Sequence, residues 1–331
     1  MDQNIKKPTV KDVAREAGVS VATVSYIMND RKDQKISEET RKKVLQIANL
    51  LNYRPSHAAK TLATGRTNLI GIAYRLEEST PARNMEITCF VNLLIERLNR
   101  MSYNVLFICA DAEASVLPLS GNLDGILAID LPHDLFRKLA DSYLVPVISV
   151  DMFVGDPLFY QIYTDYSDAF ERALALHSSA SSSSAPQSSV SSSDAGVITL
   201  VMDDYANEAF DRSVKEAWTA GPVCSAGELC SSLAVEASRG TGDSCGIESR
   251  RGAGGSAAGQ FVCLGAYAAL MLGHYLAPEC LTVLCGSNAC AGLPAGVRTV
   301  LLDSEKKANL CISILLNAID RNFNVAHDFP V

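Results

Sequence analysis

Apolar residues recur at helical spacing in three short runs near the start of the chain, at residues 10–17, 24–28 and 44–51. Thr9 opens the first run with the pattern [ST]-x-x-[DE], which is typical of a capping box at a helix start. Gly18 closes that run, because glycine readily takes the left-handed conformation that a helix end requires. The pattern predicts three short helices that share one small core.

The connection between the first two predicted helices is only residues 18–20. So short a connection containing glycine makes the helices cross steeply, which is the geometry of a helix-turn-helix. Ser20 caps the second helix, and its exposed groups are small apolar side chains and hydroxyls. Such groups contact thymine methyls, base edges and phosphates in DNA. The alternative is an ordinary three-helix module whose surface has no such role.

Residues 54–67 follow the third predicted helix and carry a different signal. Pro55 stands where a helix can begin and Gly65 where it would end. A helix of one or two turns is too short to be stable alone, so this hinge segment is expected to need a partner for order. Leu62 on a basic strip is a candidate wedge for a minor-groove step, and Arg54 and Lys60 are placed to meet phosphates.

Charge is distributed unevenly along the chain. Residues 1–68 hold 13 Lys and Arg against 7 Asp and Glu, a net charge of +6, whereas the whole chain carries −8. The remaining residues therefore carry −14. A basic head on an acidic body is the asymmetry expected when only the head meets nucleic acid.

Strand-like and helix-like patterns alternate after residue 67. Apolar runs at 68–74, 105–110, 125–129 and 147–150 predict buried strands, and helical spacing at 86–102 and 135–143 predicts helices between them. This alternation predicts an α/β body with a doubly wound parallel sheet. Ligands of such sheets bind beyond the carboxyl ends of the strands.

The head resembles the LacI/GalR family of bacterial transcription regulators. The resemblance rests on TVKDVAREAGVSVATVSYIMN at residues 9–29 and ISEETRKKVLQIANLLNYRPSHAAKTLATGRTNLIGI at 36–72. It implies a homodimer whose helix-turn-helix units occupy major grooves of a double-stranded operator, with paired hinge helices in the central minor groove. The candidate DNA-binding residues are Thr9, Ser20, Val21, Ala22, Thr23, Ser25, Tyr26, Arg54, Ser56, Ala59, Lys60, Leu62 and Ala63.

The resemblance also implies a body like a periplasmic sugar-binding protein, with two subdomains and an effector between them. We expect a DNA-binding domain at 1–53, a hinge at 54–67 and a body at 68–331, whose first subdomain comprises about 68–163 plus 290–322 and whose second comprises about 164–289. The pieces LDGILAID at 123–130 and VPVISVD at 145–151 fit the first subdomain well.

The second half departs from this pattern. A Ser-rich stretch at 177–195 interrupts it, and residues 219–260 show little periodicity, as a flexible insertion or a damaged subdomain would. Residues 264–266 read Leu-Gly-Ala where the family usually has a polar effector pair, and the chain is expected to stop short of the usual final strand. The candidate effector residues are Arg75, Asp151, Arg212 and Asn288. The alternative, to which we give equal weight, is that these are structural or surface residues that bind no ligand.

The cysteine spacing, the catalytic motifs and the hydropathy of the sequence exclude several classes of protein. The ten cysteines form no C-x-x-C pair and have no nearby histidine at zinc spacing, so we expect thiols and neither a metal nor a cofactor. No hydrolase or metalloprotease motif is present, so an enzyme is not expected. The sequence has no secretory signal and no apolar run that spans a membrane, which predicts a cytoplasmic, nucleoid-associated bacterial protein.

Two hypotheses therefore remain for the body. In the first, a sugar or related metabolite changes the operator affinity of a dimeric repressor by biasing the subdomain arrangement. In the second, the regulator has no small-molecule response and is controlled by a protein partner or by abundance. The hinge sequence joined directly to a sugar-binding-like body supports the first hypothesis, which we adopt, and the missing polar pair and the Ser-rich interruption are the grounds for the second as its alternative.

Overall fold

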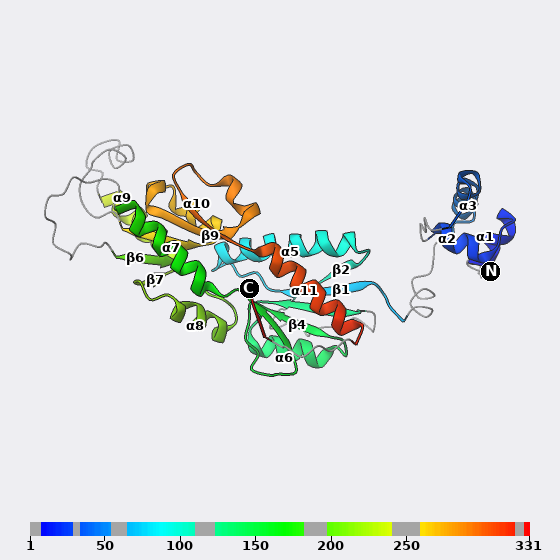
Figure 1. The fold of residues 1–331 in the computed structure, drawn as a ribbon, viewed down its shortest axis with the longest axis horizontal. Coiled ribbons are helices and arrows are strands. Elements are labelled where there is room, and N and C mark those ends of the chain that lie inside the picture. Colours follow the sequence, from blue (N-terminus) through cyan, green and yellow to red (C-terminus); the bar gives the residue numbers. More distant parts are fainter. Residues whose placement is uncertain are drawn as a thin grey trace, which may run out of the picture. The chain divides into compact units, whose positions relative to one another are not determined.

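The computed structural model describes residues 8–28, 34–53, 65–109, 123–181, 197–239, 259–321 and 328–331. These residues form two compact units, a head within residues 1–67 and a body at 68–331 (Figure 1). No helix in the described ranges is long and apolar enough to cross a membrane.

The described part of the head contains three helices, as the sequence predicts: α1 (Val10–Ala17), α2 (Val21–Met28) and α3 (Glu38–Leu50). Each helix turns its apolar face to one shared core, because the 3.6-residue period brings those side chains to one side. The fully buried core residues are Val13, Ala14, Ala17, Val24, Ile27, Val44 and Ala48.

The first lobe of the body is a six-stranded parallel sheet in the order β11-β5-β4-β3-β1-β2. Its strands are β1 (Leu69–Tyr74), β2 (Asn104–Cys109), β3 (Gly125–Ile129), β4 (Val147–Val150), β5 (Tyr160–Tyr163) and β11 (Asp328–Pro330). Its helices are α5 (Pro81–Arg100), α6 (His133–Ser142) and α11 (Ser304–Ile319).

Side chains of the first sheet alternate between two apolar layers. Leu127 and Ile129 of β3 face the layer of α5 and α11, whereas Ile126 and Ala128 face the layer of α6. Both faces are covered, which explains why the predicted strands read as continuous apolar runs. Helix α5 begins at Pro81, five residues before the predicted start, because proline fits the first turn of a helix.

The second lobe is a five-stranded parallel sheet in the order β10-β9-β8-β6-β7. Its strands are β6 (Ile198–Val201), β7 (Val223–Cys224), β8 (Gln260–Leu264), β9 (Leu281–Gly286) and β10 (Arg298–Leu302). Its helices are α7 (Tyr166–Ser181), α8 (Glu208–Ala217), α9 (Ala226–Arg239) and α10 (Ala266–Leu272), with short 3₁₀ turns η1 (Pro278–Cys280) and η2 (Ser287–Gly292).

Three sequence-based expectations about the second half are wrong. Residues 219–239 are not without structure, since β7 and α9 lie there, while residues 240–258 lie outside the described residues. The chain also has a final strand, because β11 pairs with β5 through Phe329 opposite Ile162. Finally, β10 belongs to the sheet of the second lobe, so the return to the first lobe comes after residue 302 and not near 290.

Candidate functional sites

The turn between α1 and α2 is fixed by backbone geometry. Gly18 has φ 69°, and the N–H of Val19 donates to the carbonyl of Ala14 at 3.1 Å, which ends α1. Ser20 then caps α2, because its hydroxyl accepts from the N–H of Thr23 at 3.0 Å. At the start of α1, the Asp12 carboxylate accepts from the N–H and hydroxyl of Thr9 at 2.9 and 2.7 Å. These local bonds set the crossing of the two helices.

One face of α2 is left open. Val21 is 42% exposed, and Ala22 and Ser25 are also exposed, while Val24 and Ile27 on the opposite face are buried. Thr23 and Tyr26 are half-buried at the edge of this face. An exposed helix face of small and hydroxyl side chains, held on a rigid turn, suits entry into the major groove of DNA.

The hinge candidates Arg54, Ser56, Ala59, Lys60, Leu62 and Ala63 lie outside the described residues. The described chain reaches Tyr53, whose N–H donates to the carbonyl of Ala48 at 2.8 Å and so closes the end of α3. It resumes at Gly65, which has φ 68°.

In the body, the carboxyl ends of the strands of both sheets meet at the junction of the two lobes. Asp130 directly follows β3 and Asp151 directly follows β4, and both adopt left-handed backbone angles, φ 46° and 50°. Aspartate tolerates this conformation better than most residues. The turn directs both carboxylates into the junction, where each is almost fully buried.

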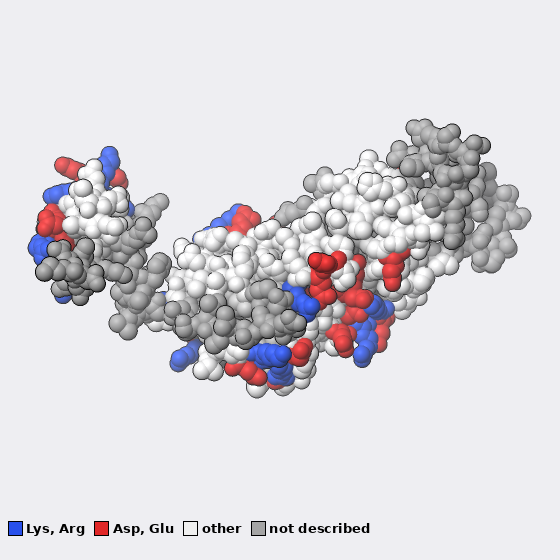
Figure 2. Space-filling view, turned by 180° about the vertical axis from the view of Figure 1, so that it is seen from behind, with Lys and Arg blue, Asp and Glu red and all other residues white. Residues whose placement is uncertain are grey.

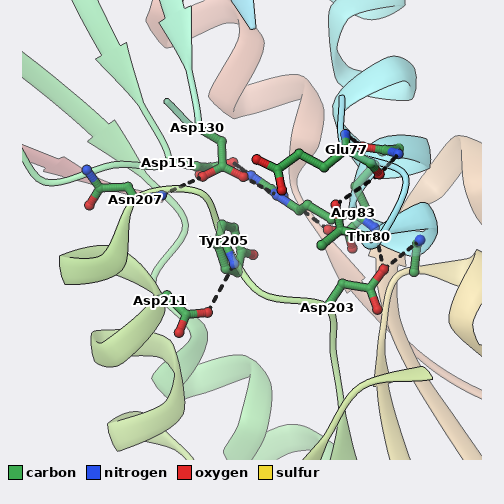
Figure 3. A network of polar contacts seen from close by, with 12 residues as sticks. Glu77, Thr80, Arg83, Asp130, Asp151, Asp203, Tyr205, Asn207 and Asp211 are labelled. Atoms are coloured by element: carbon green, nitrogen blue, oxygen red, sulfur yellow. Dashed lines mark hydrogen bonds and ion pairs between the residues drawn. The ribbon is translucent and has the colours of Figure 1, made fainter. Parts of the chain in front are cut away.

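The buried guanidinium of Arg83, in the first turn of α5, lies between these carboxylates (Figure 3). Its Nε donates to Asp130 at 2.8 Å, its Nη1 to Glu86 at 3.1 Å and its Nη2 to Asp151 at 3.4 Å. The face of the group stacks on the ring of Tyr205 from the second lobe, 3.9 Å from the ring centre. A planar fork of donors with two stackable faces is what arginine offers and lysine does not.

A second cation completes the network. Lys307, in the first turn of α11, donates to both oxygens of Asp151 at 3.1 and 2.9 Å and to the hydroxyl of Thr164 at 3.0 Å. Two cations therefore serve three carboxylates in a site largely closed to water. Charges buried this deeply are tolerated only when they are paired and hydrogen-bonded.

The pKa values of the two aspartates are shifted in opposite directions. Burial raises the pKa of Asp130 above its usual value, because Arg83 and the N–H of Asn207 only partly offset the loss of water. Burial acts in the same direction on Asp151, but Lys307 and Arg83 outweigh it and hold the pKa of Asp151 below its usual value. Asp151 is therefore the carboxylate whose charge the fold favours.

Polar groups of the second lobe also form hydrogen bonds with the first lobe at this junction. The carboxylate of Asp203, just after β6, accepts from the N–H of Ala82 at 2.8 Å and of Arg83 at 3.3 Å. Asn207 donates its N–H to Asp130 at 3.3 Å and exchanges two 3.2 Å bonds with the backbone of Phe153. These contacts join the lobes around the first turn of α5.

Beside the network lies a cavity of about 680 Å³. Its wall includes Arg83, Glu86, Asp151 and Lys307 on one side and Gly265 on the other. The cavity thus reaches the carboxyl ends of strands from both sheets, which is where ligands of open α/β sheets bind.

The structure does not bring the four predicted effector residues together. Asp151 lines the cavity, but Arg75 lies outside its wall and pairs with Glu77 at 3.4 Å. Arg212 is on the exposed outer side of α8. Asn288 lies in η2, and its side chain is outside the described set.

Sequence reasoning missed Arg83, Asp130, Asp203 and Lys307. The available signal was the position of each aspartate directly after an apolar strand. Among the described residues, no three His, Cys, Asp or Glu side chains gather as a metal ion would require. The described cysteines are free thiols, and the sulfurs of Cys285 and Cys290 lie 2.9 Å apart.

The chain thus combines a helix-turn-helix head with a two-lobed α/β body that has a cavity at the lobe junction. Residues 9–56 match the family model described as bacterial regulatory proteins, lacI family. Over these residues the chain is similar to members of the lacI family.

Relatives align with about half of the chain. Catabolite control protein A of Streptococcus mutans is 52% identical over 177 residues, which is 51% of this chain and 50% of the relative. The fructose operon regulatory protein of Vibrio cholerae is 30% identical over 175 residues, 49% of this chain and 52% of the relative. The sucrose operon repressor of Klebsiella pneumoniae is 30% identical over 169 residues, 48% of each. The chain thus spans about half the length of these curated relatives.

The fold is shared over nearly the whole chain. The lac repressor dimer bound to operator and the anti-inducer ONPF superposes with a TM-score of 0.60 at 16% identity, covering 98% of this chain and 96% of that one. The transcriptional regulator CelR in complex with cellobiose gives 0.54 at 13% identity, covering 98% and 97%. At these identities the likeness concerns the fold alone.

Proposed function

We propose that this protein is a transcription repressor that binds a palindromic DNA operator as a homodimer, with an affinity that a sugar-like small molecule modulates. It is not an enzyme, and it acts in the bacterial cytoplasm on nucleoid DNA. The observation that carries the proposal is the α1–α2 turn with the open face of α2, in a head that matches the lacI family model.

In this proposal α2 reads the major groove. Val21 and Ala22 contact thymine methyls, and the hydroxyls of Ser20, Thr23 and Ser25 reach base edges or phosphates. Thr9 at the start of α1 faces the backbone, and Tyr26 supports the reading face from its edge. The head has a net positive charge, whereas acidic side chains gather in patches on the face of the body seen in Figure 2. The field of the molecule therefore directs the head to DNA.

We extend the proposal to the hinge segment on its sequence. Leu62 enters the central minor groove as a wedge, while Arg54 and Lys60 contact phosphates. Ser56, Ala59 and Ala63 belong to the hinge helix that two protomers form together on DNA. A homodimer is required because a single hinge of this length is not stable alone.

Selection of bound DNA from a random pool tests operator binding. We expect an enriched palindrome, because two identical heads related by a two-fold axis read two half-sites. Ala22→Asp places a negative charge on the open face of α2 and should abolish selection. Gln46→Asp, at an exposed position on α3, is the matched control and should leave it intact. Enrichment of no sequence, or equal effects of the two substitutions, contradicts the proposal.

For the effector we propose the cavity at the lobe junction and a sugar or related metabolite. Named relatives regulate fructose and sucrose operons. Asp151 and Glu86 line the cavity. Carboxylate oxygens of this kind accept from sugar hydroxyls. Titration calorimetry with sugars and phosphosugars tests this, and binding by none, with operator affinity unchanged by any, rejects it.

A regulator without a small-molecule response is the second candidate. Arg83 and Lys307 already occupy the carboxylates of Asp130 and Asp151, so less of the junction is free for a ligand. In that case a protein partner or abundance alone would control the repressor. The same calorimetric titration separates the two candidates.

A further inference from the structure

The position of Arg83 at the lobe junction is unusual for an arginine. Its side chain is only 7% exposed, although arginine is among the residue types least often buried. All three guanidinium nitrogens have a carboxylate partner, and one face of the group rests on the ring of Tyr205. Binding pockets hold a small cationic ligand with the same interactions, namely hydrogen bonds to carboxylates and stacking on an aromatic ring.

The partners of Arg83 come from both lobes. Glu86, Asp130 and Asp151 belong to the first lobe, and the stacked ring of Tyr205 belongs to the second. The backbone N–H of the same residue donates to Asp203 of the second lobe. Asp130, which accepts from the guanidinium, also accepts from the N–H of Asn207 in the second lobe. Arg83 therefore positions the carboxylate that makes this contact between the lobes.

Gly265 shows how closely the lobes approach here. This residue of the second lobe has φ 84°, and a side chain at its Cβ position would lie 2.6 Å from a carboxylate oxygen of Glu86. Glycine therefore permits α5 to lie directly against the end of β8. The same position is where the family's polar effector pair was expected, and it provides no polar side chain.

We propose that Arg83 is an internal ligand that closes the body: its guanidinium is held by three carboxylates of the first lobe and stacks on the ring of Tyr205 from the second lobe, and so holds the lobes together. An entering molecule either uses the remaining cavity or must displace Arg83. The contact between the lobes can be tested without DNA. Only its role in regulation rests on the proposed function, in which a small molecule binds at the junction.

Backbone amides provide a direct measure of closure. The N–H groups of Ala82 and Arg83 are in the first turn of α5, where no partner exists within the helix. Asp203 of the other lobe is their acceptor, so they are protected from hydrogen exchange only while the lobes are closed. The N–H of Asn207, which donates to Asp130, reports the same contact from the second lobe.

The experiment measures hydrogen exchange and small-angle scattering on the full chain without ligand. We expect these amides to be protected in the unmodified protein. The double variant Arg83→Met/Asp130→Asn removes one buried charge of each sign, so the charge balance is kept. It should exchange at these amides about tenfold faster or more, because the stacking of Arg83 on Tyr205 is lost and the bond from the Asn207 N–H to Asp130 is no longer charge-assisted. Its radius of gyration should increase.

The matched control is Arg137→Met/Asp156→Asn. That pair has the same 2.8 Å separation, and Arg137 also lies over a ring, that of Phe159, but all three residues belong to the first lobe. Its removal should leave exchange at the junction and the radius of gyration unchanged. Unprotected amides in the unmodified protein, or equal behaviour of the two double variants, overturns the proposal.

Chemical rescue tests the guanidinium site itself. In Arg83→Ala, millimolar methylguanidinium should restore protection of the junction amides, and methylammonium should not, because only the former is planar and reaches two carboxylates. Arg83→Lys keeps the charge without the fork and should give intermediate protection. Equal rescue by both ions, or none by methylguanidinium, rejects the site. Operator selection is a separate readout, so failure of DNA binding and failure of closure are distinguishable.

Discussion

At the scale of single residues, the chemistry of the body depends on side chains that sequence patterns describe poorly. Arg83 looks like an ordinary polar residue at a helix start, but its partners Asp130 and Asp151 lie 47 and 68 residues away along the chain. Only the parallel order of β3 and β4 brings these carboxylates together. Asp151 was predicted as an effector residue from its position in the family resemblance, and it directly follows an apolar strand, as Asp130 does.

The opposite pKa shifts of the two aspartates give a residue-scale prediction. Asp151→Asn should lower the free energy of unfolding at pH 7 by about 3 kcal/mol, since Lys307 then loses its buried counter-charge. Because the pKa of Asp151 in the folded state lies below 3.8, its contribution is present above that pH and is lost as the pH falls through the folded value. Urea unfolding at several pH values should therefore show the difference from the unmodified protein shrinking below pH 3.8.

Asp130→Asn is the comparison for this measurement. Burial raises the pKa of Asp130, so the fold disfavours its charge and removing that charge costs less at pH 7. Losses of equal size for the two variants would contradict the assignment of Asp151 as the favoured anion.

At the scale of elements, the helices and strands that could be predicted are those whose ends or apolar pattern depend on neighbouring residues in the sequence. The starts and ends of α1 and α2 follow from Thr9, Gly18 and Ser20, whose effects are confined to neighbouring residues. Helix α9 was missed because small and serine residues give its sequence weak periodicity. Leu229 and Leu233 contact a core that it shares with α10, and this tertiary packing supports the helix. Strand β11 was missed because three residues are too few for a pattern.

The turn between α1 and α2 can be tested by one substitution. Gly18→Ala should destabilise the head by about 1 kcal/mol, since an L-residue is strained at φ 69° although no atom lies within 4 Å of the added Cβ. Gly227→Ala is the matched control, because that site in α9 is equally open and its backbone is not left-handed. It should stabilise the body slightly. Thermal unfolding followed by circular dichroism measures both changes, and equal signs would refute the role of Gly18.

At the scale of the whole molecule, the division into head and body governs stability. The two units have separate apolar cores, one shared by α1 to α3 and others around the two sheets. Units with separate cores unfold as separate cooperative transitions. The alternation of strands and helices predicted the body as a class, but the lobe boundary depends on strand order, which periodicity does not encode.

Calorimetry of the full chain should therefore show more than one transition. Gly18→Ala should shift only the transition of the head, and Asp151→Asn only that of the body. A single transition that moves as a whole in both variants would mean that the two units unfold cooperatively.

The route of the chain through the body has a consequence for its synthesis. The described elements from α7 to β10 all belong to the second lobe, whereas the first lobe needs α11 and β11, which come afterwards. A chain that leaves the ribosome from its N-terminus folds domain by domain in the order in which units become complete. The second lobe is therefore complete first. At that stage the sheet of β1 to β5 still lacks β11, so the edge of β5 is unpaired. Chaperones that bind exposed strand edges would meet this protein at that stage.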